Sequence, residues 1–174
     1  MPSTPRNYWM VVVSPEYFEA SRSRNFDVLG MGKAQKKRVQ RMEVGDRVLF
    51  YVSVERLFTA TATINSTYFE DHEPVWPASN LHEDYPWRVK LRPSVVPKEN
   101  EYIDARLIAP RMQYVRKWTP EDWPMAFFDP LHLVPKLDFA MLEDEMRKHR
   151  RNPAMKVELD PDSNCALDRL PAVP

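Results

Sequence analysis

The alternation of apolar and polar positions predicts several short strands. Residues 7–13 (NYWMVVV) form a run of β-forming side chains, which is typical of a buried strand. Residues 47–53 (RVLFYVS) indicate a second strong strand. Residues 58–68 (FTATATINSTY) and 87–96 (WRVKLRPSVV) alternate between two kinds of side chain, so both predict strands with unlike faces. In the last strand, one face carries Trp87, Val89 and Leu91, and the other carries Arg88, Lys90 and Arg92.

Helix signals fall between these strands. Residues 14–15 (Ser-Pro) end the first strand, and a serine cap followed by proline in the first turn predicts a helix over residues 16–23. Residues 36–42 predict a short basic helix, with Val39 and Met42 facing inward.

The clearest helix is predicted over residues 137–148. Acids precede bases along this segment, which suits the helix dipole, and its apolar residues recur at i, i+3 and i+7. These apolar residues are Phe139, Leu142 and Met146. Residues 25–34 (NFDVLGMGKA) hold two of the three glycines of the chain and predict a loop with special backbone angles.

Residues 116–135 (RKWTPEDWPMAFFDPLHLVP) crowd aromatic residues among prolines. Each proline removes a backbone donor and fixes φ, which excludes one continuous helix or a central strand. The aromatic residues on this irregular segment are Trp118, Trp123, Phe127 and Phe128. Either these rings close a core from outside, or they form a surface that grips something flat.

Strands with unlike faces, interrupted by short helices, indicate an α+β fold, a small twisted β-barrel with helices packed around it. A chain of 174 residues is long enough for one domain with a real core. We expect this domain to span residues 1–150. Residues 151–174 are proline-rich and free of aromatic residues, and we expect a disordered tail there.

Charge and composition exclude several classes of protein. Lys plus Arg and Asp plus Glu are both 25, which excludes a protein that coats nucleic acid through bulk charge alone. The stretch from Arg22 to Arg41 nevertheless holds seven basic residues against one acid, Asp27, which suits either a local phosphate contact or a solvated helix face. The single cysteine, Cys165, excludes an internal disulfide or a cysteine-based zinc site. No apolar run approaches the roughly 20 residues of a membrane span, and we expect a cytoplasmic protein with no membrane partner.

The sequence carries none of the common catalytic or cofactor motifs. It has no phosphate-binding G-x-x-x-x-G-K-[ST] loop, no dinucleotide-binding G-x-G-x-x-G and no G-x-S-x-G nucleophile elbow. The four histidines show no metal-ligand spacing, so we expect no metal and no cofactor. What remains is a set of aromatic residues near basic ones, which can stack on unpaired bases or can simply pack a core. The candidates are Phe26, Tyr51, Trp118 and Trp123.

The order of the segments resembles the EVE family of the PUA-like superfamily. The segments that carry the resemblance are NYWMVVVSPE, NFDVLG, MEVGDRVLFYVS, FTATATINSTYFED, YPWRVKLRP and YVRKWTPEDW…LHLVPKLDF, over about residues 7–148. The closing segment resembles the prokaryotic branch. The resemblance implies a PUA-like β-barrel that reads a modified nucleobase, without catalysis. EVE domains are related to YTH domains, which read N6-methyladenine in RNA, and they themselves look like readers of modified cytosines in DNA.

The resemblance also implies roles for particular residues. A flipped base would enter an aromatic pocket at the barrel mouth, formed by Ser14, Phe26, Tyr51, Ser53, Trp118 and Trp123. Phe26 and Trp123 would be the two stacking walls, with the proline-rich segment as a lid and Trp118 as the weaker alternative. Phe26 stands where many members have tryptophan, and Asp27 stands where glycine is frequent, so this pocket departs from the family pattern. Phosphates would be bound by Lys33, Lys36, Lys37 and Arg38.

The implied partner is nucleic acid carrying a modified base. Because EVE domains often accompany restriction systems, a restriction or nuclease protein is a second expected partner. Two alternatives stay open. One is an amidohydrolase acting on a modified nucleoside, as in the related ASCH domains, and the other is a module that binds structured RNA by shape.

Overall fold

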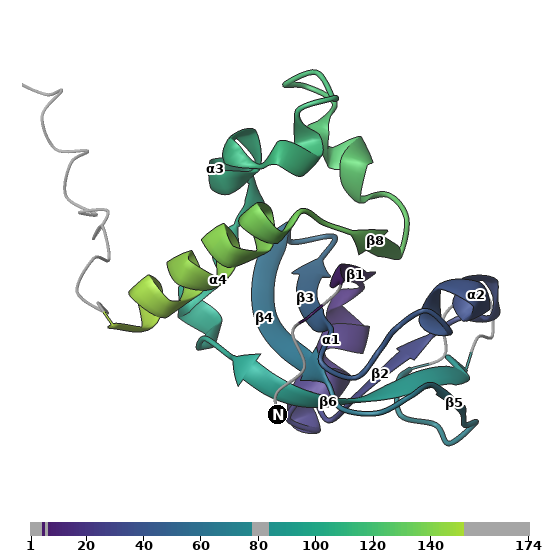
Figure 1. Ribbon diagram of the computed structural model, residues 1–174. Coiled ribbons are helices and arrows are strands. Elements are labelled where there is room, and N and C mark those ends of the chain that lie inside the picture. The colour runs from purple at the N-terminus through teal and green to yellow at the C-terminus, as the bar shows by residue number, and fades with distance from the viewer. Residues whose placement is uncertain (1–4, 6, 78–83, 152–174) are drawn as a thin grey trace, which may run out of the picture.

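A curled sheet that forms a half-barrel is the framework of the molecule (Figure 1). The computed structural model describes residue 5, residues 7–77 and residues 84–151. The strands are β1 Tyr8–Val13, β2 Val28–Met31, β3 Arg47–Val52, β4 Leu57–Ile64, β5 Phe69–Glu70, β6 Trp87–Val95, β7 Ile103–Asp104 and β8 Leu131–Leu133. Their order is β2-β6-β4-β3-β1-β8, with β5 paired to β6 and β7 paired to β4.

The pairing of β1 with β3 is parallel, whereas the other pairs are antiparallel. A parallel pair needs a crossover connection, because the chain must return to the starting edge of the first strand. That crossover contains α1 Pro15–Ser23, β2 and α2 Lys36–Val39. The remaining helices described are α3 Ala105–Ile108 and α4 Lys136–Arg151, with 3₁₀ turns at Lys33–Gln35, Glu99–Glu101, Ala109–Arg111, Gln113–Val115 and Trp123–Phe127.

Each face of the sheet buries its own hydrophobic cluster, because successive side chains of a strand point to opposite faces. On the first face, Val11 and Phe50 pack with Phe18 of α1. On the second face, Met10 and Leu49 pack with apolar residues of α4, which are Phe139, Leu142 and Met146. Glu143 fastens α4 to the sheet by accepting hydrogen bonds from Arg47 and from the hydroxyl of Thr61.

Asp46, in the turn before β3, connects the start of β3 to the start of β1 through hydrogen bonds. Its side chain is 1% exposed, and the carboxylate accepts hydrogen bonds from the backbone N–H of Asn7 (3.2 Å), the indole N–H of Trp9 (3.1 Å) and the backbone N–H of Glu43 (3.1 Å). Hydrogen bonds to an ionised acceptor are the stronger kind. One side chain therefore sets the register of the parallel pair and the turn that precedes it.

The α+β fold and most of the predicted elements are confirmed. The strands at 7–13, 47–53, 58–68 and 87–96 are β1, β3, β4 and β6 within a few residues. Ser14 caps α1 as predicted, and Phe139, Leu142 and Met146 are buried along α4. The predicted basic helix is shorter, because α2 ends at Val39, although Val39 and Met42 do face inward. The tail predicted from residue 151 lies, apart from Arg151 itself, outside the described residues.

Two local predictions were wrong. Residues 25–34 are not only a loop, because β2 lies within them after two residues with positive φ, Asn25 (57°) and Phe26 (53°). Arg88, which we placed on the polar face of β6, is 1% exposed. Of the two consecutive phenylalanines on the proline-rich segment, Phe127 is buried and closes a core, whereas Phe128 is 81% exposed. The 3₁₀ turn that ends at Phe127 directs these two consecutive rings apart.

We expect Asp46→Asn to lower the free energy of unfolding by about 2–4 kcal/mol. Both carboxylate oxygens of Asp46 accept hydrogen bonds from N–H groups, and in asparagine one of these oxygens is replaced by an NH₂ group, which cannot accept them. Hydrogen bonds to charged groups contribute about 1.5–3 kcal/mol each. Urea unfolding followed by tryptophan fluorescence measures the change. Asp27→Asn is the matched control, because the exposed carboxylate of Asp27 pairs with Arg24 at the surface, and we expect a change within about 0.5 kcal/mol. Equal losses in the two variants would contradict the role given to Asp46.

Candidate functional site

The two aromatic walls predicted from the sequence are not brought together. Phe26 is 1% exposed, and its ring packs against Phe18 and Phe50 at centroid distances of 5.7 and 5.2 Å. Trp123 belongs to the cluster on the other face of the sheet, where its ring meets Phe127 edge to face at 5.7 Å. A cage between Phe26 and Trp123 is therefore not formed, because the sheet lies between them.

The other two predicted aromatic residues also lie elsewhere. Tyr51 is 3% exposed and packs between Phe58 and Phe127, and burial raises its pKa to about 12. It follows Phe50 in β3, so it points to the opposite face from Phe50 and Phe26. Trp118, the weaker alternative for a stacking wall, is 38% exposed. Four residues of the proline-rich segment pack on the face that carries α4: Trp123, Ala126, Phe127 and Val134.

A different pocket lies where β1 ends, α1 begins, and β2 leads into the turn before α2. Its volume is about 250 Å³. Two tyrosines contribute to its lining, so we call it the tyrosine pocket. Its lining includes Ser14, Tyr17, Met31, Gln35, Tyr85 and Pro130. Pro130 is the contribution of the proline-rich segment.

Tyr17 is fixed from two directions. Its hydroxyl accepts a hydrogen bond from the N–H of Gly30 (2.9 Å) and donates one to the carbonyl of the same residue (2.7 Å). Its ring stacks on Trp76 with a centroid distance of 4.8 Å and an interplanar angle of 4°. Burial raises the pKa of Tyr17, so its phenol stays neutral. The ring is thus a rigid neutral surface.

Gly30 is required for this arrangement by close approach. A Cβ atom added at Gly30 would lie 2.3 Å from Cζ3 and 2.5 Å from Cη2 of the Trp76 ring. Real Cβ atoms do not approach other atoms so closely, and a flat indole between packed neighbours has little room to move. The glycine in the predicted loop therefore admits the tryptophan that supports Tyr17.

Tyr85 is held in place by a buried arginine. Arg88 donates hydrogen bonds to the carbonyls of Glu73 (2.6 Å), Tyr85 (3.0 Å) and Asp84 (3.2 Å). Its guanidinium also lies 3.3 Å from a carboxylate oxygen of Asp71 and 5.1 Å from the Trp76 ring centroid. The Tyr85 ring meets Tyr17 edge to face at 5.1 Å and 80°.

His72 links the two arms of chain that Arg88 organises. Its Nδ1 contacts a carboxylate oxygen of Asp84, and its Nε2 lies 3.2 Å from a carboxylate oxygen of Glu70. These two carboxylates, Asp84 foremost, raise the pKa of His72, and His72 in turn lowers the pKa of Asp84. Asp84 precedes Tyr85 in the chain, so protonated His72 favours the arrangement at the rim of the tyrosine pocket.

Two polar side chains add hydrogen-bonding capacity to the tyrosine pocket. The hydroxyl oxygen of Ser14 accepts the N–H of Tyr17 at 3.2 Å and keeps its own proton to donate. The Oε1 atom of Gln35 is buried and has no hydrogen-bond partner among the described residues. Ser53 does not line the pocket, since its N–H and hydroxyl both bond the carbonyl of Val13, at 3.0 and 3.3 Å. Of the predicted base-binding residues, only Ser14 therefore lies in this pocket.

The four predicted phosphate-binding residues lie together beside the tyrosine pocket. Lys33 is in the 3₁₀ turn that ends at Gln35, and the other three are in α2, which follows that turn. Lys33 and Lys37 are exposed. Lys36 places its ammonium 4.3 Å from the Trp87 ring centroid, and Arg38 donates a hydrogen bond to the carbonyl of Leu131 at 2.6 Å. Two of the four cations thus already have a partner within the fold.

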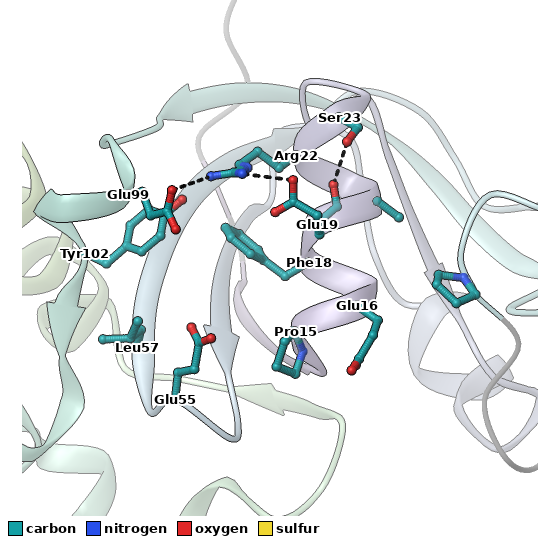
Figure 2. A pocket seen from close by; sticks show the side chains of 12 residues that line it. Pro15, Glu16, Phe18, Glu19, Arg22, Ser23, Glu55, Leu57, Glu99 and Tyr102 are labelled. Atoms are coloured by element: carbon teal, nitrogen blue, oxygen red, sulfur yellow. Dashed lines mark hydrogen bonds and ion pairs between the residues drawn. The ribbon is translucent and has the colours of Figure 1, made fainter.

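A hollow larger than the tyrosine pocket lies in a different place. It has a volume of about 710 Å³ and lies beside α1, with Phe18 and Tyr102 facing into it (Figure 2). Its acidic residues are Glu16, Glu19, Glu55 and Glu99, and its one basic residue, Arg22, lies 2.9 Å from Glu19 and 3.6 Å from Glu99. We call it the acidic hollow. It would repel phosphates, so size alone does not identify the site.

Within the described residues, no group of three or more His, Cys, Asp or Glu side chains is arranged to hold a metal ion. No helix in that part of the chain is both long and apolar enough to cross a membrane.

The match to a known family covers most of the fold. The EVE domain family matches residues 7–128, which is well over half of the chain. The chain belongs to the EVE domain family. A UPF0310 protein of the archaeon Pyrococcus abyssi is 20% identical over 148 residues, covering 79% of this chain and 97% of that protein.

Solved structures share the fold of this EVE domain. A YTH domain of Mmi1 in complex with RNA has a TM-score of 0.59 at 9% identity and covers 87% of this chain and 89% of its own. The YTH domain of the Zygosaccharomyces rouxii MRB1 protein, solved with N6-methyladenosine RNA, has a TM-score of 0.54 at 16% identity, with coverages of 83% and 90%. At such identities the likeness shows the fold alone, which is the PUA-like α+β fold.

The residues that sequence reasoning missed are Tyr17, Trp76, Tyr85 and Gln35. The sequence does contain an indication for Tyr17. It follows the capping residue Ser14 by three positions, so it lies in the first turn of α1, close to the end of β1. For Trp76 and Tyr85 no local signal exists, because they come from irregular segments.

In this EVE domain we expect Gly30→Ala to lower the free energy of unfolding by about 1–3 kcal/mol, the usual range for overpacking. The same change in a Trp76→Phe background should have a smaller effect, because phenylalanine lacks the ring atoms that the new methyl group meets. Urea unfolding of the four proteins gives the coupling energy. Strictly additive effects would show that Gly30 and Trp76 are not in steric contact.

The contact between His72 and Asp84 predicts a particular pH dependence. The pKa of His72 is raised in the folded protein. The contact therefore stabilises the folded state fully at pH values below the pKa of histidine in the unfolded chain. This stabilisation is lost as the pH rises through the pKa of His72 in the folded state. NMR titration of the imidazole should give a lower pKa for His72 in the Asp84→Asn variant than in the wild type. Glu145→Gln, far along the sequence on α4, should leave it unchanged. An identical pKa in wild type and Asp84→Asn would contradict the assignment.

Proposed function

We propose that this EVE domain reads a modified nucleobase, which it binds in the tyrosine pocket without changing it chemically. The observation that carries the proposal is the composition of that pocket: two fixed tyrosine rings, a hydroxyl donor and an unpaired amide acceptor, beside exposed lysines. Its volume of about 250 Å³ is below the roughly 300–1,000 Å³ of sites for drug-sized ligands, which suits one base rather than a whole cofactor.

The tyrosines supply the apolar part of the binding energy. Stacking of a base on an aromatic side chain contributes about 1–3 kcal/mol, and extruding a base from a duplex costs a few kcal/mol. Tyr85 is half-buried, so part of its ring faces the pocket, whereas Tyr17 is 4% exposed and acts mainly as a fixed floor. With Met31 and Pro130 on the lining, a methyl group on the base gains apolar contacts. One methyl group in an apolar pocket is worth about 1–3 kcal/mol, so selectivity for the modified base is moderate.

The polar groups select the edge of the base. Gln35 lines the pocket with its Oε1 buried and unpaired, and a turn of the side chain toward the ligand would offer this acceptor to an exocyclic amine. Cytosine and adenine carry such an amine, which keeps one N–H after methylation. The Ser14 proton suits the acceptor atom next to that amine. A buried acceptor without a partner costs about 1–3 kcal/mol, and a bound base that supplies the donor removes this penalty.

The relatives support nucleic acid as the partner. The YTH domains that share this fold were solved with RNA, in one case with N6-methyladenosine RNA. Lys33 and Lys37 stand beside the tyrosine pocket, where they would contact the phosphates of the nucleotide whose base is bound. We propose a modified cytosine in DNA or a methylated base in RNA as the ligand.

Binding without turnover is favoured by what lines the pocket. Among the described residues of the lining there is no carboxylate, imidazole or amine that could act as a general base. An amidohydrolase needs such a group, so the lining does not support this alternative.

The proposal is tested by fluorescence anisotropy with labelled DNA and RNA oligonucleotides that carry cytosine, 5-methylcytosine, 5-hydroxymethylcytosine, adenine or N6-methyladenine at one position. We expect one modified base to bind several-fold more tightly than its parent. Tyr85→Leu should weaken that binding about 5–100-fold through lost stacking and abolish the preference. Gln35→Met, which keeps the side-chain length, should reduce the preference.

Tyr68→Leu is the matched control, because Tyr68 is 41% exposed and outside the pocket, and it should change neither affinity nor preference. Equal binding of all oligonucleotides would refute the reader and favour recognition by shape. Chromatography of the recovered oligonucleotide detects any altered base, which would refute binding without turnover.

A further inference from the structure

A second pocket adjoins the tyrosine pocket and is lined by two arginines. It has a volume of about 310 Å³, and we call it the arginine pocket. Its lining includes Arg38, Arg41, Tyr114, Asp129, Leu131 and His132. Arg38 belongs to the predicted phosphate-binding set, and the other five residues lie outside it.

The two pockets are neighbours through two stretches of chain. Pro130 lines the tyrosine pocket, while Asp129 and Leu131, on either side of it, line the arginine pocket. Consecutive Cα atoms lie about 3.8 Å apart, so the pockets share a wall one residue thick. A second stretch of chain also borders both pockets: Gln35 lines the tyrosine pocket and Arg38 lines the arginine pocket. These two residues are three positions apart at α2, which corresponds to a rise of about 4.5 Å along the helix. The two pockets are therefore close enough for one chain of nucleotides to reach both.

The arginine pocket is built to receive an anion. The Nη1 atom of Arg38 donates to the carbonyl of Leu131 at 2.6 Å, which orients the guanidinium and leaves its other N–H groups to bind. Arg41 is exposed, and its side chain has no hydrogen bond or ion pair with the described residues. A guanidinium offers paired N–H groups that match two phosphate oxygens. The lining holds one carboxylate, that of Asp129, against the two arginines. Lys117 lies outside the lining, with its ammonium 5.8 Å from the Tyr114 ring centroid.

The inner wall of the arginine pocket is neutral and preorganised. Burial lowers the pKa of His132, so its ring is uncharged at neutral pH. Its Nε2–H donates to the carbonyl of Asp129 at 2.6 Å, which leaves Nδ1 to accept the Tyr114 hydroxyl at 2.6 Å. The backbone N–H of Tyr114 is in turn held by the buried carboxylate of Asp138 at 2.8 Å. The wall is thus fixed before any ligand binds.

We propose that the arginine pocket binds the phosphate group of the nucleotide next to the one whose base enters the tyrosine pocket. The inference rests on the proposed function and deepens it. Arg41 makes the main new contact, and Arg38 completes it from the position that Leu131 fixes. The subsite contributes affinity that does not depend on sequence, since phosphate contacts position a nucleic acid and base contacts specify it.

The test compares Arg41→Gln with Arg92→Gln, a matched control on β6 whose side chain is also exposed. Arg41→Gln should weaken binding of modified and unmodified oligonucleotides by the same factor, about 3–10-fold, and reduce the slope of log affinity against log salt by about 0.7–0.9. Arg92→Gln should leave that slope unchanged, and Arg41→Lys should restore most of it. An unchanged slope in Arg41→Gln, or equal slopes in the two glutamine variants, would overturn the proposal.

A second measurement uses calorimetry with ligands of increasing length. Arg41→Gln should not affect binding of the modified nucleoside, which has no phosphate, but it should weaken binding of the dinucleotide. Inorganic phosphate is tested as a competitor in the same experiment. If it displaces the dinucleotide at equal concentration, the arginine pocket is a site for free anions, and the assignment to a nucleotide is overturned. If the salt slope falls in Arg41→Gln while no base is preferred, the arginine pocket stands and the base reader fails. If the base preference is kept while the slope is unchanged, the base reader stands and the arginine pocket fails.

Discussion

The buried guanidinium of Arg88 is the constraint on which the tyrosine pocket depends. A charge that is 1% exposed must be hydrogen-bonded or paired, and Arg88 meets this need with three backbone carbonyls and a carboxylate from segments that precede it in the chain. These segments have little regular structure of their own. By drawing them around one cation, the protein fixes Trp76 and Tyr85, and through Trp76 it fixes Tyr17. An irregular region thereby gains a defined shape that apolar packing alone would not specify.

The second organising principle is the division of aromatic residues between the two faces of the sheet. Phe50 and Tyr51 are consecutive in β3 and belong to different clusters, and the same division separates Phe26 from Trp123. On the face with α4, the rings of Tyr51, Phe58 and Phe127 close a core. On the face with α1, part of the aromatic set is left at the rim of a pocket. The alternation along β3 therefore divides its aromatic residues between the two cores.

The sequence alone predicted the strands, the cap at Ser14, α4 and the fold class, because these rest on periodicity and on local hydrogen bonds. It did not predict the pocket, because Tyr17, Gln35 and Tyr85 come from separate elements and meet only after the parallel pairing of β1 with β3. The alternation along β6 gave the wrong exposure for Arg88, since a charged side chain can be buried when backbone carbonyls accept its hydrogen bonds. The basic segment from Lys33 to Arg38 lies beside a pocket, although the aromatic residues predicted to accompany it lie elsewhere.

The acidic hollow gives this electrically neutral chain an uneven surface. Acids gather beside α1, whereas lysines and arginines gather around α2. In the field of a polyanion such a molecule experiences a torque as well as an attraction, so it turns its cationic side forward before contact. A zero formal charge then keeps non-specific adhesion low, while the separation of charge orients each encounter. A uniformly basic protein cannot combine neutrality with such an orientation.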